Sequence, residues 1–249
     1  VWVEIDFECI PENLGIGSFW NEKKNGQQFL ATLNEPIFAS TWFPCNNTPN
    51  DKALLEISIT NDSNLVSLSN GKLKEVVNRA AKKTYVWESQ YPIATYLISI
   101  YSGEYETFQQ KFIYKSDTVN VDYFVTDSNF ENAKIDFNNH PEYLKIFSEL
   151  FGEYPFLKEK YGVVEILWQQ GAMESQTITS IGGNFISGRH FNEGILIHET
   201  AHNWWGNSVT LKSWDDIWLN EGFAKYSEAL YYEQISGKDA LVSTMYSFK

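Results

Sequence analysis

The sequence predicts an α+β protein in which an antiparallel β-domain precedes a mixed domain of helices and strands. Residues 1–115 contain short apolar runs separated by turns rich in Asn, Ser and Gly, a pattern typical of antiparallel strands. Beyond them, apolar residues recur with helical spacing around one strand-like run. We therefore predict a β-domain over residues 1–115 and a second domain over residues 116–249.

Three features indicate the strands and turns of the first half. Leu54–Thr60 and Tyr96–Tyr101 are apolar runs rich in β-formers, and the second stops before Gly103. The Asn-Gly pair within Ser69–Lys72 can adopt the positive φ angles of a hairpin turn. Residues 1–7 already alternate like a strand, so we expect the β-domain to be incomplete at its start.

The second half is predicted to contain three helices and one strand. Pro141–Phe151 repeats apolar residues on one side and is followed by glycine. Tyr161–Trp168 has the composition of a strand, and Phe191–Trp205 that of the next helix. A third helix is expected to begin near Ser213, whose side chain can cap it, and to run to Ile235.

Composition excludes several kinds of partner. The chain has 19 Lys and Arg against 32 Asp and Glu, a formal net charge of −13, without a basic cluster, so nucleic acid is not an expected partner. It has no run of 18 apolar residues, so no transmembrane segment is predicted. Cys9 and Cys45 could form one bridge but are too few for a disulfide framework or a cysteine zinc site. The oligomeric state is not indicated.

The spacing of two histidines predicts a metal site. His198-Glu199-Thr200-Ala201-His202 matches the pattern H-E-x-x-H. On a helix, residues four apart share a face and lie about 6 Å apart along the axis, so both imidazoles can bind one zinc ion. Glu199 leaves the helix about 100° further round and can reach a water on the metal, which makes it the expected general base.

A catalytic zinc site needs a third protein ligand and one open position. Glu221, within an Asn-Glu-Gly-Phe-Ala segment downstream of His202, can supply the ligand. A solvated helix carboxylate is the alternative, but a glycine such as Gly222 costs about 1 kcal/mol in a helix and suggests that two helices pass closely at the metal. We predict one Zn²⁺ per chain at His198, His202 and Glu221. Glu228 lies on the same helix face and is a candidate to orient a ligand.

With these motifs, the chain resembles the gluzincin aminopeptidases, the family of aminopeptidase N and leukotriene hydrolase. That family has a Gly-Ala-Met-Glu-Asn segment upstream of its histidines. Gly171–Ser175 matches that segment, with Ser175 in the place of Asn, and Glu174 lies 24 residues before His198.

The resemblance extends into the first half. Asn34–Pro36 and Trp42–Pro49 are similar to the family's Glu-Pro and Phe-Pro-Cys-x-Asp-x-Pro segments. Asn47 stands where the family has Asp, and Ser40 where it often has Arg, so local packing is expected to differ. The resemblance therefore covers nearly the whole chain.

The resemblance implies that the second half is a thermolysin-like α/β catalytic domain, truncated at its C-terminus. It also implies that Glu35 and Glu174 bind the free amino group of a peptide, and that the backbone of Gly171, Ala172 and Met173 aligns the peptide as an added strand. An ammonium taken out of water needs such carboxylates, because an unpaired buried charge costs several kcal/mol. The implied function is a zinc-dependent aminopeptidase, and the expected partners are peptides with a free N-terminus.

Family members stabilise the reaction's oxyanion with a tyrosine about sixty residues beyond the glutamate ligand, which would fall near residue 280 here. The sequence ends at Lys249. Tyr226, Tyr231 and Tyr232 lie within three turns of Glu221 on the same predicted helix and do not obviously replace it. We therefore expect these 249 residues to bind zinc but to have little or no activity alone.

Three other functions fit part of this pattern. A thermolysin-type endopeptidase shares the zinc chemistry but has no use for Glu35 and Glu174. An epoxide hydrolase occurs within the resembling family, although nothing here indicates a lipid pocket. A scaffold protein that has lost its metal is the third alternative, and the intact ligands and base argue against it. Hydrolysis of free and blocked dipeptides would separate these functions.

Overall fold

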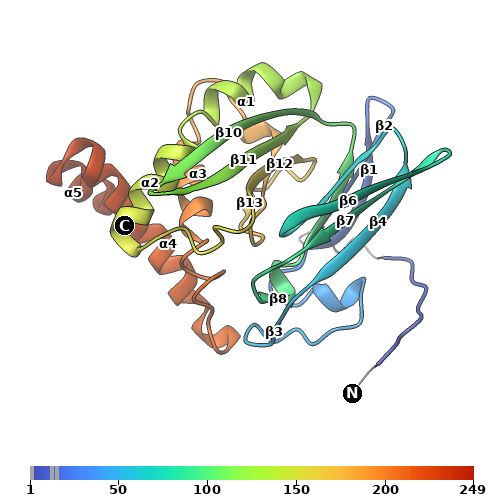
Figure 1. Ribbon diagram of the computed structural model, residues 1–249. Helices are drawn as coiled ribbons and strands as arrows, with labels where there is room; N and C mark the ends of the chain where they lie inside the picture. The colour runs from blue at the N-terminus through green and yellow to red at the C-terminus, as the bar shows by residue number, and fades with distance from the viewer. Residues whose placement is uncertain (1–2, 12–13, 15–16) are drawn as a thin grey trace.

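The first half is built of short antiparallel strands in the computed structural model, which describes residues 3–11, 14 and 17–249 (Figure 1). The strands are β1 (Ser18–Lys24), β2 (Gln27–Leu33), β3 (Lys52–Ala53), β4 (Glu56–Asp62), β5 (Val66–Ser69), β6 (Lys72–Arg79), β7 (Lys82–Glu88), β8 (Ile93–Ala94) and β9 (Ile100–Gly103). They form a four-stranded sheet in the order β1-β2-β9-β5, a three-stranded sheet in the order β4-β7-β6, and the pair β3-β8.

The local predictions for this half are confirmed in part. The strand at Leu54–Thr60 corresponds to β4, whereas Tyr96 lies in a 3₁₀ turn and β9 begins only at Ile100. The hairpin predicted at Ser69–Lys72 is wrong: Gly71 has the expected positive φ of 76°, but β5 pairs with β9 and β6 with β7. An Asn-Gly pair predicts that the chain turns at this point, but it does not predict whether the two flanking strands pair with each other. Residues 3–7 are exposed and form no strand, and residues 1–2 lie outside the described residues.

The second half contains a mixed five-stranded sheet. Its strands are β10 (Glu106–Tyr114), β11 (Asp117–Val125), β12 (Tyr161–Ile166), β13 (Ala172–Met173) and β14 (Thr179–Gly182), in the order β10-β11-β12-β14-β13. Strands β11, β12 and β14 are parallel. The sheet includes β10, which pairs with β11 along its whole length, so we propose a domain boundary between β9 and β10 and not after residue 115.

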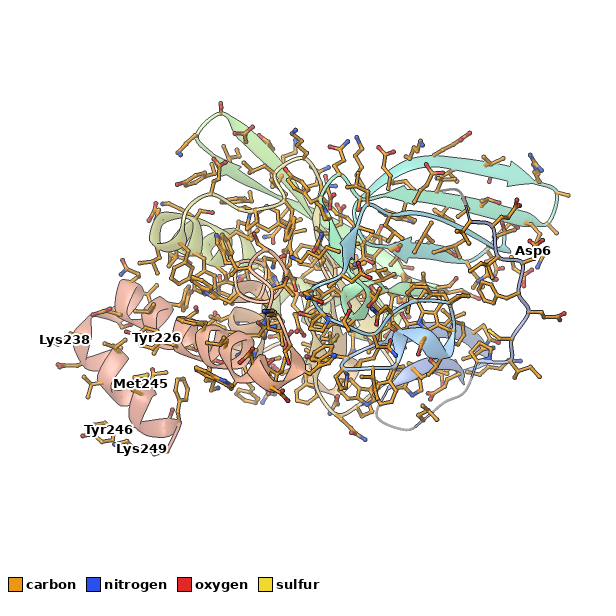
Figure 2. The ribbon with its side chains drawn as sticks, turned by 90° about the horizontal axis from the view of Figure 1, so that it is seen from below. Asp6, Tyr226, Lys238, Met245, Tyr246 and Lys249 are labelled. Carbon is orange, nitrogen blue, oxygen red and sulfur yellow. The ribbon has the colours of Figure 1, made fainter. Side chains whose placement is uncertain are left out.

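Helices cover one face of this sheet. They are α1 (Phe130–Asp136), α2 (His140–Phe151), α3 (Glu193–Ala201), α4 (Ile217–Ser236) and α5 (Lys238–Ser247). Helices α2 and α4 confirm the predicted ones, and the Ser213 side chain accepts a hydrogen bond from the Asp215 amide. The predicted helix at Phe191–Trp205 is shorter, because the chain turns directly after His202. Helix α5 carries exposed Met245 and Tyr246 at one end of the molecule (Figure 2).

Strand β12 joins the two halves through its two faces. Every residue of β12 is buried. Val163 belongs to the core under the helices, together with Phe147, whereas Val164 and Ile166 belong to the core of the β-domain. Because side chains alternate across a strand, one strand contributes to both cores and fixes the β-domain against one face of the five-stranded sheet.

Two further expectations concern membranes and cysteines. Within the ranges that the structure describes, no helix is both long and apolar enough to cross a membrane. Cys9 and Cys45 are both free thiols, so the bridge that the sequence allowed is not formed.

The Asp136 carboxylate holds the loop that leads into α3. It accepts hydrogen bonds from the amides of Ser187, Gly188 and His190 and from the Ser187 hydroxyl. Burial opposes the charge of Asp136, but these donors outweigh burial and lower the pKa of its carboxyl. The loop entering α3 therefore depends on the charged form of Asp136.

We predict that Asp136→Asn lowers the free energy of unfolding by about 1–3 kcal/mol at pH 7, because an amide nitrogen cannot accept these bonds. The folded-state pKa is depressed, so the contribution is complete above the unfolded pKa of about 3.9 and is lost as the pH falls below it. Urea unfolding at several pH values measures the difference, with the exposed Asp51→Asn as the control. An effect that stayed constant down to pH 3 would contradict this account.

Candidate metal centre

The rings of His198 and His202 lie close together, edge to face, at the end of α3. The Nδ1 atom of His198 lies 2.8 Å from Glu228 Oε1, and that of His202 lies 2.9 Å from the Trp205 carbonyl oxygen. Both oxygens are acceptors, so each Nδ1 carries a hydrogen, and in the neutral rings both Nε2 atoms present lone pairs. The two Nε2 atoms are 3.0 Å apart.

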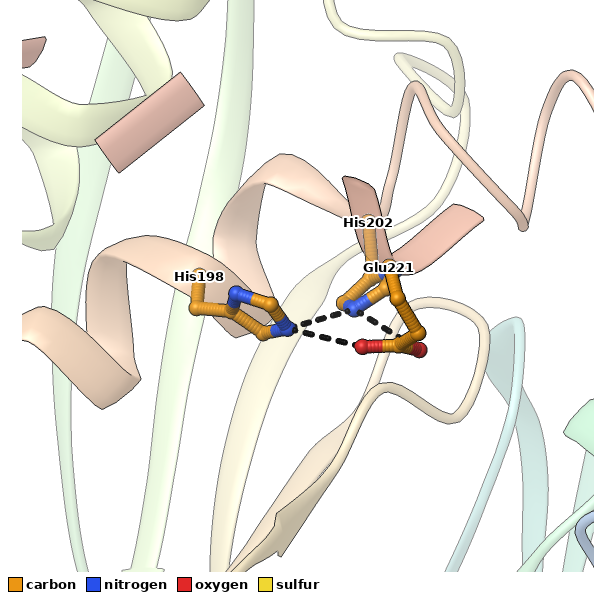
Figure 3. A group of neighbouring side chains, drawn as sticks. All are labelled: His198, His202 and Glu221. Carbon is orange, nitrogen blue, oxygen red and sulfur yellow. Dashed lines mark hydrogen bonds and ion pairs between the residues drawn. The ribbon is translucent and has the colours of Figure 1, made fainter. Parts of the chain in front are cut away.

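The Glu221 carboxylate on α4 completes this group (Figure 3). Its Oε2 lies 3.3 Å from His198 Nε2, and its Oε1 lies 3.7 Å from His202 Nε2. Ligand atoms 2.0–2.1 Å from a tetrahedral zinc ion would be about 3.3 Å from one another. The three observed separations bracket that value, so this donor set fits zinc.

The protonation equilibria of these groups also reflect a site for a cation. Burial, with the nearby His198, lowers the pKa of His202 to about 4. Burial also opposes the charge of His198, but hydrogen bonds to Glu221 and Glu228 outweigh it and raise its pKa to about 10. A shared positive charge between these acceptors is therefore favourable, whether it is a proton or a metal ion.

Three more carboxylates converge on the same place. Atoms of Glu174, Glu199 and His202 lie within 4.8 Å of one another, as do atoms of Glu35, Glu174 and Glu221. One oxygen each of Glu174 and Glu199 is buried without a hydrogen-bond partner. Burial, then repulsion by Glu221, raises the pKa of Glu174 to about 7, and burial, then repulsion by Glu174, also raises the pKa of Glu199. Burial and Glu174 likewise raise the pKa of Glu35.

The Gly171–Ser175 segment lies at the edge of the five-stranded sheet. Ala172 and Met173 form β13, which pairs with β14 on one side only. The Gly171 carbonyl accepts a hydrogen bond from the Gly182 amide at 2.9 Å. The Ser175 hydroxyl, at the position of the family's Asn, lies 3.3 Å from the Tyr101 hydroxyl.

The two departures from the family pattern in the first half contact each other. Asn47 donates to the Ser40 hydroxyl at 2.7 Å and accepts from the Ser40 amide at 3.2 Å. A neutral hydrogen-bonded pair thus occupies the positions where the family often has charged residues.

The expectation for Gly222 is wrong. A Cβ at Gly222 would meet nothing within 4 Å, so a close approach of two helices does not explain that glycine.

Sequence reasoning missed several residues around the site. Pro36, Trp214 and Ile217 line an apolar cavity of about 410 Å³ with Glu35 and Glu221. The Lys225 ammonium lies 2.9 Å from Glu228 Oε2. The Tyr96 ring stands edge-on to Trp214 at 5.0 Å. Lys225 and Glu228 have the i, i+3 spacing of neighbours on a helix. The other contacts join segments that are distant in the sequence, so no short sequence pattern predicts them.

Comparison with known proteins identifies the fold. The model of the Peptidase M1 N-terminal domain matches residues 3–97, and that of the Peptidase family M1 domain matches residues 135–249. The chain belongs to the M1 peptidase family. An M1 zinc metallopeptidase variant from Deinococcus radiodurans, solved with a Tyr-Ser-Ala substrate, superposes with a TM-score of 0.77 at 25% identity, over 90% of this chain and 50% of that one. Native yeast LTA4 hydrolase gives a TM-score of 0.75 at 27% identity, over 88% of this chain and 33% of that one.

Curated relatives of the M1 chain are aminopeptidases by name. Leucine aminopeptidase 2-2 of Scheffersomyces stipitis is 30% identical over 213 residues, which are 86% of this chain and 32% of the relative. Probable aminopeptidase 1 of Sulfurisphaera tokodaii is 25% identical over 233 residues, 90% of this chain and 29% of the relative. The M1 chain therefore spans about a third of the length of these relatives.

The geometry of the three donors predicts one zinc ion per chain. We expect near-unit zinc in protein prepared without chelator, and at least a 10-fold loss of affinity in His202→Ala, which removes a ligand. Glu199→Gln should keep the metal, because Glu199 is not one of the three donors. Metal analysis by mass spectrometry after dialysis measures both. Unchanged zinc in His202→Ala would rule out this donor set.

Proposed function

We propose that the protein containing this M1 chain is a zinc-dependent aminopeptidase that releases N-terminal residues from peptides. The observation that carries the proposal is that two carboxylates, those of Glu35 and Glu174, lie beside the three metal donors. The donors of His198, His202 and Glu221 fit zinc, and Glu35 and Glu174 have oxygens within 4.8 Å of one on Glu221. A carboxylate pair beside the metal suits an ammonium next to the scissile bond.

The roles of the side chains follow from this arrangement. Zinc, when bound, polarises the scissile carbonyl and lowers the pKa of a water molecule towards 7. Glu199 takes a proton from the attacking water and later gives it to the leaving amine. Its raised pKa, caused by burial and then by Glu174, suits a group that must hold a proton briefly. Glu228 orients His198 through the 2.8 Å contact to Nδ1.

The substrate backbone is proposed to lie along β13. This strand is at the edge of its sheet, with Ala172 and Met173 paired to β14 on one side, so its other side can add an extended peptide. Glu174 directly follows β13 and faces the Glu35 carboxylate from the β-domain. The peptide's amino group would then end between Glu35 and Glu174, one residue from the cleaved bond.

In the protein that contains this chain, Glu174→Ala should lower kcat/KM for free-amine substrates by about 10²–10³-fold, the cost of breaking a buried charge pair. Substrates with an acetylated N-terminus, which carry no ammonium, should lose far less. Aminoacyl and N-acetyl-aminoacyl chromogens measured in parallel test this, with the exposed Glu149→Ala as the matched control. Equal losses on both substrate types would make Glu174 structural and favour an endopeptidase.

We further propose that these 249 residues alone hydrolyse peptides slowly. Among the described residues, the Tyr96 hydroxyl is engaged with Gly206 and Asn220, and Tyr231 is buried with its ring 5.2 Å from that of Tyr143. Tyr226 is 43% exposed on α4 (Figure 2). Burial, and then the charges of Glu174, Glu35 and Glu221, raise the pKa of Tyr96, so its hydroxyl lies near these carboxylates, but its hydrogen is already donated to the Gly206 carbonyl.

Loss of one oxyanion donor costs about 10²–10³-fold in turnover. The M1 chain should therefore hydrolyse aminoacyl chromogens at least 100-fold more slowly, at equal zinc loading, than an M1 aminopeptidase that has such a donor. Glu199→Gln sets the background rate of the assay. Comparable kcat/KM values would mean that another group within these residues stabilises the oxyanion.

A further inference from the structure

The turn that follows α3 positions two functional residues at once. Its Trp205 carbonyl accepts the hydrogen of His202 Nδ1 at 2.9 Å and so sets the orientation of that ring. The Asn207 amide donates to the His202 carbonyl at 3.0 Å. The Asn207 side chain donates to the Glu174 carbonyl at 2.8 Å. A displacement of this turn would therefore move both a metal donor and a substrate-binding carboxylate.

The β-domain holds this turn from outside the catalytic half. The Lys52 ammonium donates to the carbonyls of Asn207 at 2.7 Å and Ser208 at 3.1 Å. The Tyr96 hydroxyl donates to the Gly206 carbonyl at 3.5 Å. Both donors come from one small unit, because Lys52 in β3 pairs with Ala94 in β8, two residues before Tyr96. Three successive carbonyls of the turn are thus held by the β3–β8 pair and by the 3₁₀ turn that directly follows β8.

Tyr96 also reaches the helix that carries the third metal donor. Its hydroxyl accepts a hydrogen bond at 3.3 Å from the side chain of Asn220, the residue before Glu221. Gly206 lies between these groups with φ +113°, and a Cβ there would be 3.1 Å from Asn220 Nδ2 and 3.4 Å from His202 Nδ1. The hydroxyl of one fully buried tyrosine therefore links the turn after His202 to the start of α4.

We propose that Lys52 and Tyr96 are positioning residues for the metal centre, and we refer to them as the β3–β8 clamp. Through the turn and Asn220, they hold His202 and Glu221 in the arrangement that binds zinc. The affinity of the catalytic half for zinc then depends on the β-domain. This inference rests on the proposed zinc site but assigns a role to residues that bind neither metal nor substrate.

Partners that orient metal ligands typically contribute about 10–100-fold to metal affinity. The clamp acts one contact further out, so we expect Tyr96→Phe and Lys52→Met each to speed zinc release by about 10-fold, the lower end of that range. Release into excess chelator, followed by stopped flow, measures the rate without any enzymatic assay. The visible spectrum of the Co²⁺-loaded protein should also change, since it reports the geometry of the donors.

The controls remove the same chemical groups elsewhere. Tyr114→Phe removes a hydroxyl that donates to the Ser148 carbonyl at 3.2 Å, and Lys82→Met removes a surface ammonium 2.7 Å from Asp62. Both should release zinc at the wild-type rate. Tyr96→Phe removes a single oxygen, so it decides the question even if Lys52→Met does not fold.

Faster release and an altered Co²⁺ spectrum in Tyr96→Phe, with both controls unchanged, would support the clamp. If the wild type binds zinc tightly and a folded Tyr96→Phe variant releases it at the same rate, the clamp is overturned but the zinc site is not. Equal acceleration in the controls would likewise overturn it, because the effect would then be general loosening. A wild-type chain that binds no zinc would overturn the zinc site and the clamp together.

Discussion

The main constraint on the site is the repulsion among four carboxylates that the fold brings together. Glu35, Glu174, Glu199 and Glu221 converge beside two imidazoles, and all but Glu221 have raised pKa values. A zinc ion and a substrate ammonium would supply three positive charges against four negative ones. Transfer of a proton from water to Glu199 does not change this sum, because the negative charge moves to the water oxygen. Cations are therefore the groups that make this arrangement favourable, and the fold must hold the carboxylates in place until they bind.

Several elements share that task. Asp136 holds the loop before α3, the turn at residues 205–208 holds His202, and Glu228 holds His198. Strand β12 packs into both cores and keeps the β-domain, which supplies Glu35, against the catalytic sheet. Each of these contacts satisfies a buried polar group or fills a core. The energy that orders the site thus comes largely from ordinary packing and hydrogen bonding away from it.

Local patterns in the sequence predicted what depends on local geometry. Helical periodicity indicated α2 and α4, and the spacing of His198 and His202 placed both rings on one face. Glu35 could be assigned only through the resemblance, because its approach to Glu174 depends on the packing of two domains. The failed hairpin at Ser69–Lys72 and the missed partners Lys52 and Tyr96 have the same cause. Pairing between distant segments leaves no periodic trace in the chain.

In the proposed aminopeptidase, the register of cleavage would depend on the packing between the two domains and not on either domain alone. The metal donors and Glu174 belong to the catalytic half, whereas Glu35 belongs to the β-domain. An ammonium held between Glu35 and Glu174 lies at a fixed distance from the metal only while β12 keeps both cores in contact. A free amino group favours that position because it neutralises buried carboxylates, and an acylated one leaves them unpaired. The preference for the first peptide bond would then follow from where the two domains meet.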